Sequence, residues 1–193
     1  MELTKTQENI LKSARDLFLS QGYPATTIDQ IVESAGVSKG SFYHAFPSKE
    51  EMGIVLLEWY QQGGEQLFLN GPFAQIKDPK KKMFAYIDHI ENVSKELWGH
   101  GCLLGTLGLE LAETSPKIRK RISKIFNHLI LELEPLFQPV ERNNGSKAGP
   151  TAKDTAEQFL MTMEGAIMFA RVNNDWKYFS RGIQNFRDHL NML

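Results

Sequence analysis

The stretch TTIDQIVESAGVSKGSFYHAFPS, residues 26–48, constrains the fold of this chain more than any other segment. Thr27 can cap a helix, with Gln30 in capping-box position, and apolar residues then recur at helical spacing. Gly36 has no Cβ, so it can take the left-handed conformation that ends a helix. Ser38 is well placed to cap a second helix. The sequence therefore predicts two short helices joined by a tight turn.

The second of these helices has the composition of a surface that binds DNA. Between Ser38 and Lys49 the chain carries two lysines, a histidine, a tyrosine and three serines, but no acidic residue. A helix-turn-helix presents the first residues of its second helix to base edges in the major groove. Lysine, serine and tyrosine side chains can hydrogen-bond there to bases or to phosphates. We therefore predict a DNA-reading helix; the alternative is ordinary packing in a small helical bundle.

An N-terminal helix, the sequence TTIDQIVESAGVSKGSFYHAFPSKEE and a helical remainder of this length together resemble the tetracycline-repressor (TetR) family of bacterial regulators. The resemblance is specific from Ile10 to Leu57 and is one of architecture beyond that range. It implies that the C-terminal part dimerises and binds a small effector. In that family, certain positions of the motif contact DNA. The resemblance implies the same role for the residues at those positions here, which are Thr27, Lys39, Tyr43, His44 and Lys49.

The motif and the resemblance together define a predicted DNA-binding surface on the N-terminal part of the chain. Its residues are Thr26, Thr27, Ser38, Lys39, Gly40, Ser41, Tyr43, His44 and Lys49.

We expect an all-α protein in two parts. Residues 1–48 are predicted to form a three-helix DNA-binding head that contains the helix-turn-helix. A long helix then links this head to a helical effector-binding and dimerisation domain, residues 49–193. Ser115 followed by Pro116 is a strong start signal for an amphipathic helix that should end near Pro135. No alternating pattern that would indicate a strand competes with these helices.

Composition limits the class of protein further. Hydrophobic content of 41% and charged content of 23% are ordinary for a soluble globular chain. No apolar run approaches the roughly 20 residues of a membrane helix, and the first residues lack a signal-peptide pattern. The single cysteine excludes an internal disulfide, so we expect a cytoplasmic protein with no membrane partner.

The net charge is unusual for a protein that binds DNA. The chain carries a formal charge of −1, and residues 1–50 contain five Lys or Arg against six Asp or Glu. Within the motif, the positive charge is local to the turn and the second helix. We therefore expect modest non-specific DNA affinity and a shallow dependence of binding on salt.

One reading helix contacts too few bases to be selective, so we expect a homodimer on half-sites about 34–36 Å apart. The last two predicted helices are the candidate interface, because small residues allow close approach and an apolar seam follows them. The alternative is that both helices complete the core of a single chain. The predicted interface residues are Phe159, Met163, Ala166, Ala170, Trp176, Phe179, Ile183, Phe186 and Leu190.

An effector pocket should be apolar with a few polar groups, and the helices between residues 83 and 169 could build one. We expect a small apolar or electrophilic effector, although each candidate could instead be ordinary core. Histidines 89, 100 and 128 have no metal-ligand spacing with acids or the cysteine, so we predict no metal and no cofactor. The candidate effector-binding residues are Phe84, Ile87, Trp98, Cys102, Leu103, Leu107, Phe126, Phe159, Met163 and Phe169.

Cys102 carries a more specific hypothesis. Its segment, GCLLGTLGLELAE, resembles one in a TetR subgroup in which a cysteine after glycine senses electrophiles or oxidants. A helix that starts near Gly101 would favour the reactive thiolate at its N-terminus. The alternative is that Cys102 is a small buried hydrophobic residue.

Together these patterns predict a dimeric, sequence-specific transcriptional regulator, in the simplest case a repressor that an effector releases from its operator. An electrophile-sensing repressor acting through Cys102 is a variant of the same class. An all-helical enzyme is disfavoured, because the sequence offers no nucleophile-base-acid set and no phosphate-binding glycine loop. A helical protein-binding adaptor would not need an acid-free helix that opens with lysine, serine and tyrosine.

Overall fold

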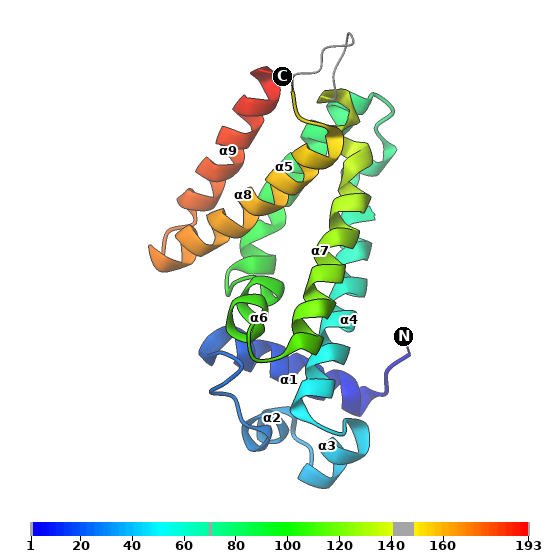
Figure 1. Cartoon of the computed structure of the whole chain (residues 1–193), viewed down its shortest axis with the longest axis vertical. Coiled ribbons are helices and arrows are strands. Elements are labelled where there is room, and N and C mark those ends of the chain that lie inside the picture. Colours follow the sequence, from blue (N-terminus) through cyan, green and yellow to red (C-terminus); the bar gives the residue numbers. More distant parts are fainter. Residues whose placement is uncertain (1, 70, 141–148, 193) are drawn as a thin grey trace. The chain divides into compact units, whose positions relative to one another are not determined.

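The computed structural model describes the backbone of residues 2–69, 71–140 and 149–192, and the side chains of these residues except 65–69. This part of the chain is helical throughout and contains no strand, which confirms the all-α prediction (Figure 1). None of its helices is long and apolar enough to span a bilayer. The α-helices are α1 (Lys5–Gln21), α2 (Ile28–Ala35), α3 (Lys39–Ala45), α4 (Lys49–Leu69), α5 (Pro79–Trp98), α6 (Leu103–Leu111), α7 (Pro116–Phe137), α8 (Ala152–Val172) and α9 (Lys177–Met192), with 3₁₀ turns η1 (Pro72–Gln75) and η2 (Gln138–Val140).

The chain divides into two compact units. The first comprises residues 1–65 and 102–125, and the second comprises residues 66–101 and 126–193. The first unit thus combines the three N-terminal helices with most of α4, all of α6 and the start of α7. The boundary that we predicted between residues 48 and 49 falls inside this unit. The DNA-binding motif is therefore built together with segments that lie far from it in sequence.

The core of the second unit is a cluster of buried aromatic rings centred on Phe159 of α8. The ring of Phe159 lies 5.9 Å from Tyr86, 5.6 Å from Phe137 and 5.2 Å from Phe186, measured between centroids. Aromatic pairs at these distances add to the free energy gained by burial itself. These contacts join α5, α7, α8 and α9 within the unit.

Helix α7 extends to Phe137, two residues beyond the end that we predicted at Pro135. A proline inside a helix removes one backbone hydrogen bond and usually bends or ends the helix. Here the residues after Pro135 stay helical, and Phe137 is completely buried in the aromatic cluster. We infer that packing of this ring offsets the cost of the proline.

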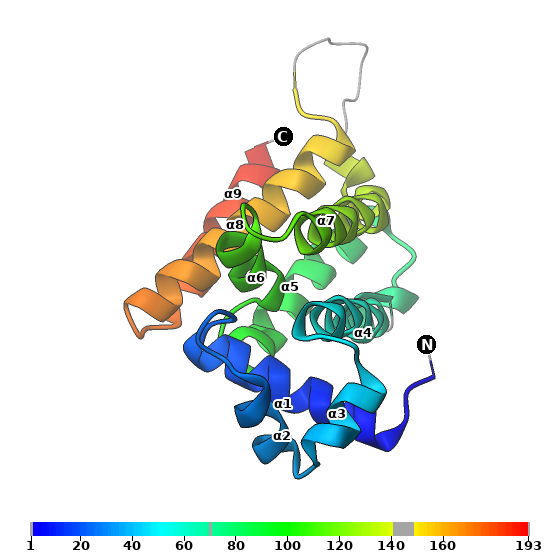
Figure 2. The same cartoon turned by 60° about the horizontal axis from the view of Figure 1, so that its bottom comes forward.

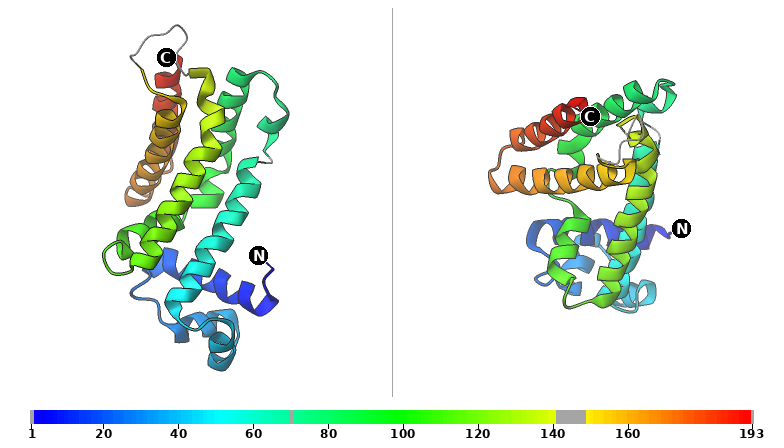
Figure 3. Two further views of the ribbon diagram at one scale, coloured as in Figure 1. Left: turned by 45° about the vertical axis from the view of Figure 1, so that its right-hand side comes forward. Right: turned by 45° about the horizontal axis from the view of Figure 1, so that its top comes forward.

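Helices α8 and α9 lie side by side within the second unit (Figures 1 and 3). A Cβ added to Gly182 of α9 would lie 3.0 Å from the Cβ of Ala166, so the two backbones approach closely at this glycine. The apolar seam that we predicted as a dimer interface faces the interior of this pair. Trp176 is half-buried, and the other predicted interface residues are buried within the single chain: Phe159, Met163, Ala166, Ala170, Phe179, Ile183, Phe186 and Leu190.

Burial within one chain favours the alternative stated from the sequence, that these residues complete its core. Ala166 differs from the others because it also lines a groove between α8 and α9. The physical reason is that α8 carries apolar residues on two faces, and spacing alone does not say which face is internal.

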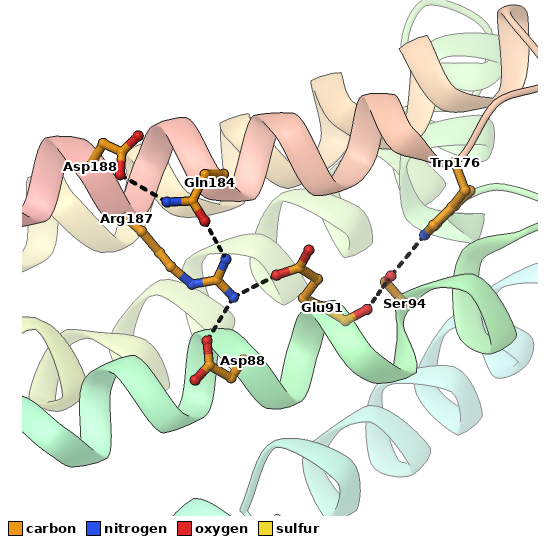
Figure 4. A network of polar contacts seen from close by, with 7 residues as sticks. All are labelled: Asp88, Glu91, Ser94, Trp176, Gln184, Arg187 and Asp188. Atoms are coloured by element: carbon orange, nitrogen blue, oxygen red, sulfur yellow. Dashed lines mark hydrogen bonds and ion pairs between the residues drawn. The ribbon is translucent and has the colours of Figure 1, made fainter.

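A polar network connects α5 to α9 at the edge of this core (Figure 4). The guanidinium of Arg187 contacts the carboxylates of Asp88 at 2.7 Å and Glu91 at 2.5 Å. At the other end of the network, the indole N–H of Trp176 donates to the Oγ of Ser94 at 2.9 Å. The side chain of Arg187 is only 14% exposed, so its charge depends on these two acids for compensation.

We expect the substitution Arg187→Gln to destabilise the protein by about 2 kcal/mol, because it leaves the partly buried carboxylate of Glu91 without its cation. Chemical denaturation at fixed protein concentration measures this change. Lys177→Gln is the matched control on the same helix, since Lys177 is exposed and should change stability by less than about 0.5 kcal/mol. Equal effects of the two substitutions would show that the network contributes nothing to stability.

Candidate DNA-binding site

The two helices of the motif form as their end signals predict. The hydroxyl of Thr27 accepts from the Gln30 N–H at 3.2 Å, and the Gln30 side chain accepts from the Thr27 N–H at 2.8 Å. Gly36 ends α2 with φ 65° and ψ 33°, which is the left-handed conformation. The N–H of Val37 then donates a hydrogen bond to the carbonyl of Val32 at 3.0 Å. This turn fixes the angle at which α3 leaves α2, and both helices pack against α1 (Figure 2).

Helix α3 separates a buried side from an exposed one. Its cap is Ser38, whose Oγ accepts from the Ser41 N–H at 3.0 Å. Phe42 is completely buried, and its ring lies 6.0 Å from that of Phe46. Tyr43, in contrast, is 51% exposed. The exposed residues of this surface are Thr27, Ser38, Lys39, Gly40, Tyr43 and His44, and Ser41 is half-buried beside them.

Lys39, the first residue of α3, forms an ion pair across the motif. Its Nζ lies 2.7 Å from the carboxylate of Asp29 in the first turn of α2, and both side chains are exposed. The hydrogen bond and the charge of Asp29 raise the pKa of Lys39. The ammonium is therefore firmly protonated and held at the start of the exposed face.

Thr26 has a structural role that its position in the motif did not reveal. Its side chain is only 1% exposed, so it cannot present its hydroxyl to DNA. The Oγ donates to the carbonyl of Gly22 at 2.7 Å and accepts from the Gln21 amide at 3.2 Å. These bonds hold the turn between α1 and α2, and we leave Thr26 out of the proposed surface.

Lys49 is also turned toward the protein, although we predicted it as a phosphate contact. Its Nζ donates to the carbonyls of Tyr23 and Thr26, each at 2.5 Å, and lies 4.0 Å from the centre of the Tyr23 ring. Desolvation lowers the pKa of this ammonium. Lys49 therefore supports the turn before α2, and we leave it too out of the proposed surface.

A carboxylate from α6 holds the same turn from the other side. The N–H of Tyr23 donates to an Oε of Glu110 at 2.7 Å. Gly22 has φ +87°, and a Cβ there would lie 2.5 Å from the second Oε of Glu110. Burial, together with the charge of Glu50, raises the pKa of the Tyr23 hydroxyl to about 12. The turn that sets the direction of α2 is thus held by Lys49 of α4 and Glu110 of α6.

The sequence did not identify Glu110 as a functional residue. Its partner Tyr23 lies 87 positions earlier in the chain, and no local pattern links the two. The only signal was an acid inside an otherwise apolar segment, LLGTLGLEL. A buried or half-buried charge in such a segment indicates a specific partner, but the segment does not say which one.

Comparisons with known proteins agree with this geometry. Residues 10–53 match the family model for bacterial regulatory proteins of the tetR family, and residues 79–183 match the LmrA/YxaF-like transcriptional regulator C-terminal domain. The HTH-type transcriptional regulator YxaF of Bacillus subtilis is 31% identical over 177 residues, which cover 88% of this chain and 87% of YxaF. The chain belongs to the TetR family.

Further comparisons extend over nearly the whole chain. The HTH-type transcriptional repressor DhaR of Mycobacterium sp. is 26% identical over 178 residues, 91% of this chain and 87% of DhaR. The crystal structure of the regulatory protein TetR from Rhodobacter sphaeroides shares the fold, with a TM-score of 0.82 at 22% identity, covering 96% and 99% of the two chains. As a TetR-family member, this protein is a DNA-binding transcriptional regulator and not an enzyme.

The predicted effector-binding residues are divided between the two units. Cys102, Leu103 and Leu107 belong to the first unit, and the other seven candidates belong to the second. Phe169 is 53% exposed, and Phe84 and Phe126 are half-buried. The remaining candidates, Ile87, Trp98, Cys102, Leu103, Leu107, Phe159 and Met163, are buried side chains.

Cys102 is the N-cap residue of α6, as the sequence suggested, but it is only 7% exposed. Its burial favours the interpretation as a small hydrophobic residue. The proposed subgroup of cysteine sensors stays a prediction for this TetR protein.

An exposed apolar groove lies on the outer side of α8 and α9. Its volume is about 450 Å³, and a Cβ added to Gly165 on its floor would meet no atom within 4 Å. Phe169 is the only predicted effector residue that lines it. The lining is formed by Met161, Thr162, Gly165, Ala166, Phe169, Tyr178, Arg181, Gly182 and Asn185.

We expect Lys49→Met to lower the free energy of unfolding by about 1–3 kcal/mol, because the carbonyls of Tyr23 and Thr26 lose their hydrogen-bond donor. DNA affinity should fall while the slope of log K against log salt stays that of the parent, since the inward ammonium releases no counterions. Binding titrations over a range of salt concentrations measure this slope. A slope smaller by about one per subunit would instead make Lys49 a direct phosphate contact.

Proposed function

We propose that this chain is a homodimeric transcriptional repressor that reads operator DNA with α3 and releases it when a small effector binds. The observation that supports this most is the exposed face of α3, which carries Lys39, Tyr43 and His44 and no acidic side chain. Such a face offers donors to base edges and to phosphates. Repression is proposed because the related DhaR is itself named a repressor.

Gly40 supports an external partner for this face. It is the second residue of α3, and glycine costs up to about 1 kcal/mol relative to alanine within a helix. A Cβ added to Gly40 would have only the Oγ of Ser38 within 4 Å, at an ordinary 3.7 Å. Nothing within the protein therefore requires glycine here. Its absence of a side chain would let a DNA backbone or base edge approach the helix closely.

The proposed dimer interface is the groove on the outer side of α8 and α9 rather than the seam predicted from the sequence. Met161 and Phe169 are exposed in its lining, and Val172 is exposed at the end of the same helix. Gly165 leaves room on the same face for a helix of the partner. TetR-family regulators act as dimers, and pairing through this face would bury the largest exposed apolar side chains of α8.

We propose a route for effector control within the first unit. Cys102 and Leu103 begin α6, and Glu110 near the end of the same helix holds the turn before α2 through Tyr23. A ligand that moves or reorients α6 would therefore disturb the turn that aims the reading motif. We propose a small apolar or electrophilic effector, because α6 is mainly leucine and glycine and begins at Cys102.

Substitutions on the reading face should abolish specific DNA binding without unfolding the protein. Tyr43→Ala and Lys39→Ala each remove an exposed side chain, so we expect operator affinity to fall at least tenfold, or about 1.4 kcal/mol or more. Gel-shift titration with a duplex selected by the parent protein measures this loss. Lys12→Ala on α1 is the control and should bind as the parent does. Parent-like binding by both reading-face variants would refute the assignment of this face.

Phe169→Glu should convert the dimer to a monomer, because it places a charge at the centre of the proposed interface. Light scattering coupled to size exclusion measures the molar mass. Leu109→Glu is the control: Leu109 is 87% exposed on α6, outside the groove, so this variant should stay dimeric. If Phe169→Glu stays dimeric, the interface lies elsewhere.

A further inference from the structure

Three of the five cations among residues 2–50 of this protein lie in ion pairs with acids. Among residues 2–50, Lys12 lies 4.0 Å from Glu8, Arg15 lies 2.7 Å from Asp16, and Lys39 lies 2.7 Å from Asp29. The remaining two cations are Lys5 and Lys49, and the ammonium of Lys49 donates to two backbone carbonyls. The pair of Lys39 with Asp29 differs from the others because it lies on the reading motif itself.

Asp29 is well placed to change what Lys39 can do on DNA. A lysine ammonium has three N–H donors and one positive charge. The carboxylate of Asp29 uses one donor and offsets the charge, and it leaves two donors for other acceptors. Non-specific DNA binding depends on charge, because it is driven by release of counterions from phosphates. A hydrogen bond to a guanine edge depends on a correctly placed donor instead.

We propose, on the basis of the DNA-binding function proposed above, that Asp29 is a specificity-determining residue. By pairing with Lys39, it suppresses the attraction of this ammonium to any phosphate and holds it at the start of α3, where a base edge can accept its remaining donors. Asp29 therefore lowers affinity for non-specific DNA more than affinity for the operator. The same arrangement explains how a head with more acids than bases can still discriminate between DNA sequences.

The test compares Asp29→Asn with Glu33→Gln. Both substitutions remove one acid from α2, but Glu33 forms no ion pair among the described residues. Comparison of the two variants therefore isolates the effect of the contact between Asp29 and Lys39. Fluorescence anisotropy would measure binding of the parent and variants to a duplex selected by the parent and to a random-sequence duplex of equal length. Circular dichroism and molar mass would establish that each variant is folded and dimeric.

We expect Asp29→Asn to raise affinity for the random duplex roughly fivefold or more at about 0.1 M salt, and to steepen its salt slope by about one per subunit beyond Glu33→Gln. The ratio of specific to non-specific affinity should fall accordingly. In a Lys39→Gln background, Asp29→Asn should act no differently from Glu33→Gln. This last comparison shows whether Asp29 acts through Lys39.

Two results would overturn the proposal. Asp29→Asn could match Glu33→Gln on both duplexes, which would make Asp29 an ordinary acid that repels DNA. It could also raise both affinities equally and leave the ratio unchanged. Failure of the proposed function would look different, since the parent protein itself would then select no DNA sequence from a random library.

Discussion

The orientation of the reading motif depends on one turn, residues 22–26, between α1 and α2. Three separate groups hold it: the carboxylate of Glu110 on the Tyr23 N–H, the ammonium of Lys49 on two carbonyls, and the buried hydroxyl of Thr26 on the Gly22 carbonyl. Two of these contacts involve a charged side chain, and such hydrogen bonds are typically stronger than neutral ones. Because α2 begins directly after this turn, a change in its shape would redirect α3 as well.

Charge is used within this head for internal order more than for attraction to DNA. Most of its cations are committed to acids or carbonyls, so the long-range field toward a polyanion is weak. Binding by the exposed donors on α3 then depends on the geometry of hydrogen bonds to acceptors on the DNA, and not on charge alone. The same pairing gives a physical reason for the shallow salt dependence of DNA affinity that we predict from the sequence composition.

How much of this could be predicted from the sequence depended on whether the interaction was local. The capping of α2 by Thr27 and its end at Gly36 involve neighbouring residues, and the structure shows both as expected. The motif, the all-α fold and the family followed from such signals. The inward positions of Thr26 and Lys49 depend on carbonyls that become neighbours only after the chain has folded. No spacing rule identifies an acceptor of that kind.

Helix α8 shows the same limit on a larger scale. Phe159 and Met163 are buried in the single chain, whereas Met161 and Phe169, on the other side of the helix, are exposed. Both faces satisfy the spacing expected of an apolar stripe, so the sequence indicated that two surfaces exist without ranking them. In the folded chain, one of these faces packs against α9, as the close approach of Gly182 to Ala166 shows.

The turn also sets the scale of what an effector must do. A hydrogen bond to a charged group such as Glu110 contributes about 1.5–3 kcal/mol. A factor of ten in affinity corresponds to about 1.4 kcal/mol, so in the proposed mechanism a contact of this size that forms only in the DNA-bound arrangement would couple α6 to operator affinity by tenfold to hundredfold per reading motif. In this proposal, release of DNA does not need a large displacement of α2 and α3. It needs only that the effector favour a position of α6 in which the carboxylate of Glu110 no longer reaches the backbone of Tyr23.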